Sequence, residues 1–142
     1  MPLEAKLWIQ RVALGLAALV FVGAGVMHFV RPAFFVAIVP PFLPAPLALV
    51  YVSGVFELLG GVGLLIPRAR RWAAYGLIAL LIAVFPANIY MAVEAERFAA
   101  ELKVSPAALF VRLPIQLVLI AWVYAIATPV TSSEASTTSD DV

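Results

Sequence analysis

The sequence predicts an all-α integral membrane protein, a bundle of four transmembrane helices. Of its 142 residues, 65% are hydrophobic and 12% are charged, and the mean hydropathy is +1.09. These fractions lie well beyond those of a soluble domain. Four apolar stretches, at residues 8–30, 47–66, 71–93 and 106–127, are long enough to cross a hydrocarbon layer about 30 Å thick. We expect one four-span domain over residues 1–127.

The first apolar stretch begins after Lys6 and Arg11, which is also how a signal peptide begins. However, this stretch continues to Val30, whereas the apolar core of a signal peptide has roughly 7 to 15 residues. We therefore interpret it as a retained transmembrane helix. The second span is ended by Pro67, and Ser105 followed by Pro106 predicts the N-cap and first residue of the fourth.

The segments outside the spans differ in character. Residues 31–46 contain five prolines, which forbid a continuous helix. Because this segment is otherwise apolar, we expect it to rest at the membrane interface or to cap the bundle. Residues 94–105 place Phe98 and Leu102 on one helical face, with Arg97 and Glu101 on another, which predicts a short surface helix. The tail at residues 128–142, rich in Ser and Thr, is expected to be disordered.

The loop charges predict an orientation. Four spans place both termini on one side, and the positively charged side chains are more numerous there than on the other side. Both termini are therefore expected in the cytoplasm, with the chain in the plasma (inner) membrane. The compared side chains are Lys6, Arg11, Arg68, Arg70 and Arg71 on the terminal side, and Arg31, Arg97 and Lys103 on the other.

Each span carries polar side chains that hydrocarbon would not tolerate. At a rise of ~1.5 Å per residue they lie roughly 3 to 15 Å below the outer boundary, in one layer. A charge at a helix centre costs about 3 kcal/mol, so we expect an ion pair between Glu57 and Arg112. The layer is either a structural latch or a binding site. It consists of His28, Ser53, Glu57, Asn88, Arg112 and Gln116.

Small residues and prolines complete the pattern within the spans. Stripes of small residues permit close helix contact, and prolines at positions 86 and 114 free the carbonyls of Ile82 and Phe110. The stripes are Ser53, Gly54, Glu57, Gly60 and Gly61 on the second span, and Ala79, Ala83 and Ala87 on the third.

Several classes of function are excluded or disfavoured. The chain has no cysteine, which excludes thiol chemistry and iron–sulfur ligation, and a single histidine excludes haem held by two histidines. A net charge of +1 without a basic stripe does not fit nucleic acid. We find no nucleophile and base pair, phosphate-binding glycine loop or metal-ligand spacing, and so we predict no catalytic or metal-binding residue and no autonomous enzyme.

Four segments resemble the family of small DoxX-like membrane proteins: GAGVMHFVRPAFF (23–35), VPPFLP (39–44), YVSGVFELLGGVGLLIPRARR (51–71) and FPANIYM (85–91). This group includes a subunit associated with thiosulfate:quinone oxidoreduction, partners of redox enzymes and assembly factors. The resemblance implies a four-span fold. Its motif positions are occupied by His28, Pro32, Ser53, Gly54, Glu57, Pro86 and Asn88.

The resemblance implies an accessory or quinone-proximal subunit that works with a redox partner. A quinone headgroup is a candidate ligand, because His28, Asn88 and Arg112 could donate hydrogen bonds near the membrane boundary. The alternatives are a small-solute or proton-linked transporter that uses Glu57 and Arg112, and an assembly factor for another membrane protein. No lipid-facing seam predicts an oligomeric state.

Overall fold

The computed structural model describes residues 1–128, and within them the chain is entirely helical apart from turns. Four long apolar helices can cross a membrane: α1 (Leu3–Val30), α3 (Pro46–Leu65), α4 (Arg70–Val93) and α6 (Pro106–Ala127). Two short helices, α2 (Pro32–Ala37) and α5 (Ala95–Leu102), lie between them. The predicted four-helix membrane bundle is confirmed. The tail predicted to be disordered falls outside the described residues, apart from Thr128.

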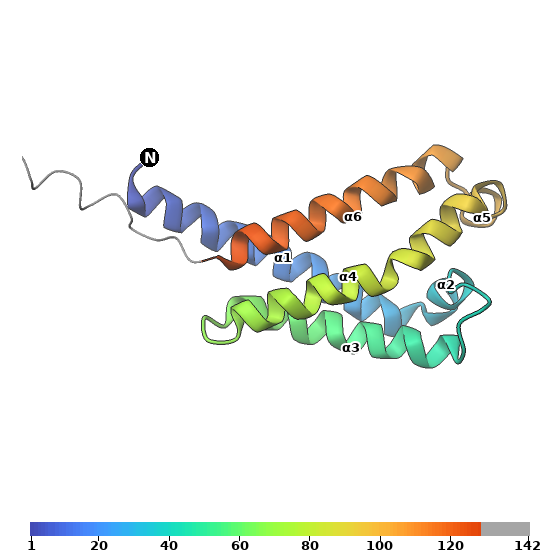
Figure 1. Cartoon of the computed structure of the whole chain (residues 1–142), viewed down its shortest axis with the longest axis horizontal. Helices are drawn as coiled ribbons and strands as arrows, with labels where there is room; N and C mark the ends of the chain where they lie inside the picture. The colour runs from blue at the N-terminus through green and yellow to red at the C-terminus, as the bar shows by residue number, and fades with distance from the viewer. Residues whose placement is uncertain (129–142) are drawn as a thin grey trace, which may run out of the picture.

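The four long helices alternate in direction, so that the connections gather at two ends of the molecule (Figure 1). The N-terminus, the α3–α4 turn and the end of α6 lie at one end, which we call the terminal side. Helices α2 and α5 lie at the other end, which we call the α2–α5 side. This is the arrangement that four membrane crossings require.

Helices α1 and α3 pack closely because glycines face each other across their contact. A Cβ atom added to Gly25 would lie 3.0 Å from the carbonyl oxygen of Gly54, and one added to Gly54 would lie 2.8 Å from Cβ of His28. These separations leave no room for a larger residue. The small-residue stripe predicted on α3 therefore forms a close helix contact. Ala79 and Ala83 on α4, in contrast, are exposed and make no such contact.

The main hydrophobic core lies on the terminal side, where all four long helices contribute. Its largest buried side chains include Phe21 of α1, Leu64 of α3, Leu77 of α4 and Val123 of α6. Helix α6 packs mainly on α4, and α3 packs on both α1 and α4. Helix α4 therefore lies between α3 and α6 in the packing order.

A second core closes the α2–α5 side. Phe98 of α5 is fully buried together with Ile38, Met91 and Leu109, and Phe35 of α2 packs against them. The opposite face of α5 carries an exposed ion pair in which Nε of Arg97 lies 3.1 Å from Oε1 of Glu101. A buried face and an ionic face confirm the predicted surface helix, and Phe34, Phe35 and Ile38 of the proline-rich segment pack in this core.

Candidate functional site

The most buried charged contact joins His28 of α1 to Glu57 of α3. Nδ1 of His28 lies 2.9 Å from the carbonyl oxygen of Ala24 and 3.1 Å from Oε2 of Glu57. The two side chains are only 11% and 14% exposed. Oε2 of Glu57 is buried and accepts no hydrogen bond of normal geometry among the described residues. A buried carboxylate with this little compensation is costly and marks a candidate site.

The position of His28 follows from its neighbours on two other helices, α2 and α3. Its ring stacks on Phe35 of α2, with ring centres 3.9 Å apart and planes 21° from parallel. Its Cβ occupies the space that Gly54 leaves on α3. The proline-rich segment is thus part of the site, because it brings Phe35 over the imidazole ring.

The predicted ion pair between Glu57 and Arg112 is wrong. Glu57 pairs with His28, and Arg112 is exposed and makes no hydrogen bond or ion pair with any described residue. The depth of the two residues in their helices is similar, but α4 lies between α3 and α6. The depth estimated from the sequence put Glu57 and Arg112 in one layer of the membrane, but it did not show whether their helices are neighbours.

A second polar contact joins α4 to α6. Nδ2 of Asn88 donates a hydrogen bond to Oε1 of Gln116, whose Nε2 donates to the carbonyl oxygen of Leu81. Gln116 is buried, with 3% exposure. Pro86 was predicted to free the carbonyl of Ile82, and the carbonyl that accepts this bond belongs to the preceding residue, Leu81. This pair links two neighbouring spans, as interhelical hydrogen bonds do in membranes.

The six residues of the predicted layer therefore do not form one cluster. His28 with Glu57 and Asn88 with Gln116 are two separate pairs. Ser53 is half-buried one helical turn before Glu57, and its side chain makes no hydrogen bond within the described part of the chain. Arg112 stands apart on the surface of α6.

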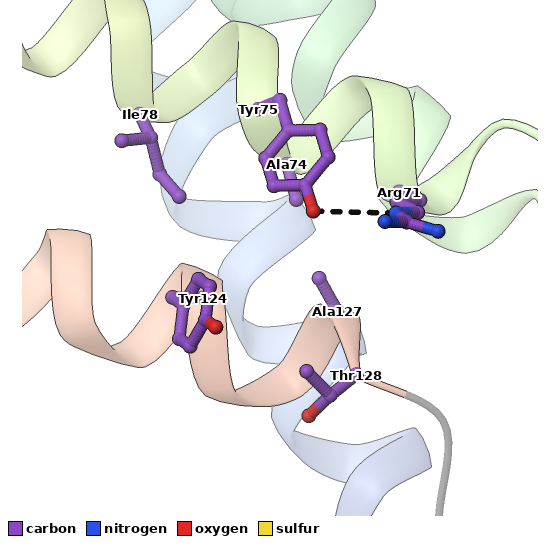
Figure 2. A pocket seen from close by; sticks show the side chains of 7 residues that line it. All are labelled: Arg71, Ala74, Tyr75, Ile78, Tyr124, Ala127 and Thr128. Carbon is purple, nitrogen blue, oxygen red and sulfur yellow. Dashed lines mark hydrogen bonds between the residues drawn. The ribbon is translucent and has the colours of Figure 1, made fainter.

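A cavity of about 300 Å³ lies between α4 and α6 on the terminal side (Figure 2). Nε of Arg71 donates to the hydroxyl of Tyr75 at 3.2 Å. This cavity was not predicted from the sequence, in which the one relevant signal is the four-residue spacing of Arg71 and Tyr75. Its lining residues are Arg71, Ala74, Tyr75, Ile78, Tyr124, Ala127 and Thr128.

The fold and the buried pairs define a small four-span helical membrane protein. The chain belongs to the family described as a domain of unknown function (DUF8561), whose family model matches residues 16–127. The matched region includes all four polar residues of the two buried pairs. No curated protein and no solved structure is significantly similar to the chain.

Proposed function

We propose that the chain is an accessory, non-catalytic membrane subunit of the DoxX-like kind, which works with a redox partner in the plasma membrane and has both termini in the cytoplasm. The observation that carries this proposal is Arg112, an exposed arginine inside a span with no counter-ion among the described residues. It lies ~9 Å from the start of α6. A charge at the centre of a span costs about 3 kcal/mol unless another group compensates it, and Arg112 lies part of the way to that depth.

The surroundings of Arg112 favour a protein partner. Val111 and Ile115, one residue before and three residues after Arg112 on the same helix, are 50% exposed and present apolar surface beside it. A second copy of the chain is a poorer match, because Glu57, the acidic residue of the spans nearest to that depth, is buried against His28. A transmembrane helix of another protein that carries Asp or Glu would supply the missing charge.

This proposal is tested by purifying the intact protein from its native membrane after photocrosslinking from position 115. We expect one membrane protein that carries a flavin, haem or iron–sulfur centre to be crosslinked, and its recovery to fall about tenfold in Arg112→Leu, as loss of a close charge pair implies. Arg112→Lys should keep most of the recovery, and Arg31→Leu is the control for loss of an exposed charge. Equal recovery with Arg112→Leu, or a crosslinked protein without a redox centre, would contradict the proposal.

The buried His28–Glu57 pair supports two further roles. Nε2 of His28 makes no hydrogen bond among the described residues, and it is the atom that would contact the oxygen of a quinone headgroup. The same pair favours a proton-linked carrier as the second candidate function, with His28 in the role that we first assigned to Arg112. Proteoliposomes that contain the pure protein separate the candidates: a carrier gives a flux that Glu57→Gln abolishes and Arg112→Leu preserves, whereas an accessory subunit gives no flux.

A further inference from the structure

The cavity between α4 and α6 is lined by polar side chains, which we call its polar edge, and by apolar side chains, which we call its apolar wall, and both helices contribute to each. Ala74 and Ile78 of α4, with Ala127 of α6, supply apolar lining, while the remaining lining side chains carry a guanidinium or a hydroxyl group. In Figure 2, Arg71 and Tyr75 of α4 lie on one side of the cavity and Tyr124 and Thr128 of α6 on the other. Such a cavity suits an amphiphile that places one polar group at the membrane boundary.

The polar edge is suited to an anion. Arg71 uses Nε to bond Tyr75, so its two terminal nitrogens remain available as donors toward a ligand. The hydroxyl of Tyr75 accepts from Arg71 and can still donate its own hydrogen, and Tyr124 brings a second hydroxyl to the opposite wall. Within residues 1–128, no acidic side chain lines the cavity. A phosphate group matches this set of donors, because guanidinium binds two of its oxygens at once.

The lower wall of the cavity is held in place from α1. Nε2 of Gln10 donates to the carbonyl oxygen of Ile126 at 3.1 Å and to that of Thr128 at 2.8 Å. These carbonyls end α6 and would otherwise lack partners. The end of α6 that carries Thr128 is therefore tied to α1 by contacts within the described chain.

We propose that this cavity binds the phosphate headgroup of an anionic membrane lipid, with an acyl chain along the apolar wall. Arg68 lies in the adjoining turn and Arg70 begins α4, and both add to the positive charge at this end of the bundle. Basic pockets between transmembrane helices are known to take such headgroups. The apolar wall within two spans favours a lipid over a soluble phosphate ester.

The full-length protein in nanodiscs of phosphatidylcholine, with phosphatidylglycerol added in steps, tests the site. Native mass spectrometry counts the lipid that remains bound. Arg71→Gln should lower the affinity for phosphatidylglycerol about tenfold, the loss expected for a two-point charged contact. Arg68→Gln removes an equal charge outside the cavity and should change the affinity for phosphatidylglycerol by less than about twofold. Tyr124→Phe removes one donor with little effect on folding and should weaken binding about threefold.

Three outcomes would overturn the proposal. Equal losses in Arg71→Gln and Arg68→Gln would mean that the lipid responds to the charge of the whole surface. Unchanged binding in both Arg71→Gln and Tyr124→Phe would place the lipid elsewhere. Soluble glycerol phosphate is measured in parallel, and if it binds in an Arg71-dependent manner while phosphatidylglycerol does not, the site takes a free phosphate ester. If Arg71→Gln does not fold, Tyr124→Phe decides between these results.

Discussion

Glycine at positions 25 and 54 determines how closely α1 approaches α3. The two residues face each other, and a Cβ atom on Gly25 would lie 2.9 Å from Cγ of Leu58 as well as 3.0 Å from the backbone of α3. The same contact places His28 within reach of Glu57. The geometry of the buried pair therefore depends on two residues that have no side chain.

We expect Gly25→Ala to destabilise the folded protein by about 1 to 3 kcal/mol, because the added methyl group would force α1 and α3 apart. Gly23→Ala is a matched control on the same helix, since a Cβ there meets nothing within 4 Å. It should be neutral or stabilising by up to about 1 kcal/mol through helix propensity. Reversible unfolding in mixed micelles measures both changes, and equal losses would argue against the close contact.

Gln116 is the most buried polar residue of the α4–α6 contact. Replacing it with Leu would leave Nδ2 of Asn88 and the carbonyl of Leu81 without this partner, at a cost of about 1 kcal/mol. A double-mutant cycle with Asn88→Leu should give a coupling energy of about 0.5 kcal/mol or more. Ser53→Ala, at a side chain without a hydrogen bond, is expected to change stability by less than about 0.5 kcal/mol. Additive effects of the Asn88 and Gln116 changes would show that the hydrogen bond between these two side chains does not stabilise the α4–α6 contact.

Among the elements, α5 does most to hold the α2–α5 side together. Phe98 of this helix is fully buried, and the helix is followed by its C-cap residue Lys103, which adopts a left-handed conformation with φ of 55°. The pKa of Arg97 on its outer face is raised by its hydrogen bonds to Glu101 and Tyr90. These bonds favour the charged form of Arg97, and they hold the ion pair on the face of α5 opposite to Phe98.

The left-handed position of Lys103 predicts the effect of one substitution. A residue with a Cβ atom pays roughly 1 to 2 kcal/mol in this conformation, whereas glycine does not. Lys103→Gly should therefore stabilise the protein by about 1 kcal/mol. Lys103→Ala removes the charge but keeps the Cβ atom, so it should show no gain. Thermal unfolding in detergent compares the two variants, and an equal gain in both would assign the effect to the charge.

At the scale of the whole molecule, the bundle is asymmetric. All four long helices meet in the core on the terminal side, but α1 and α6 share few contacts, and α6 reaches the α2–α5 side chiefly through α5 and α4 (Figure 1). One flank of α6 therefore remains uncovered. This flank carries Arg112, and it is the surface that we propose for a partner helix.

The proposed orientation can be tested cleanly because the chain has no cysteine of its own. Ala69→Cys places a thiol in the α3–α4 turn, and Phe42→Cys places one in the proline-rich segment, where residue 42 is 75% exposed. In intact cells a membrane-impermeant maleimide should label position 42 and should reach position 69 only after permeabilisation. The unmodified chain is the control, and the reverse labelling pattern would invert the proposed topology.

Some features follow from the sequence because they depend on residues that are close along the chain. The sequence boundaries of the four spans agree with the helices to within about one residue except at the start of α1, which begins at Leu3. The amphipathic pattern of α5 and the N-cap at Ser105 are local too, and Oγ of Ser105 accepts a hydrogen bond from the amide of Ala108 at 3.3 Å.

The tertiary structure alone decides which polar side chains meet. Hydropathy and helical rise place a residue at a depth, but they do not say which face of its helix turns toward which neighbour. His28 meets Glu57 because glycines bring α1 against α3, and Gln116 meets Asn88 because α6 packs on α4. Arg112 has no partner because α4 separates its helix from Glu57. The sequence determined the level of each polar group in the membrane, and the order in which the helices pack determined its partner.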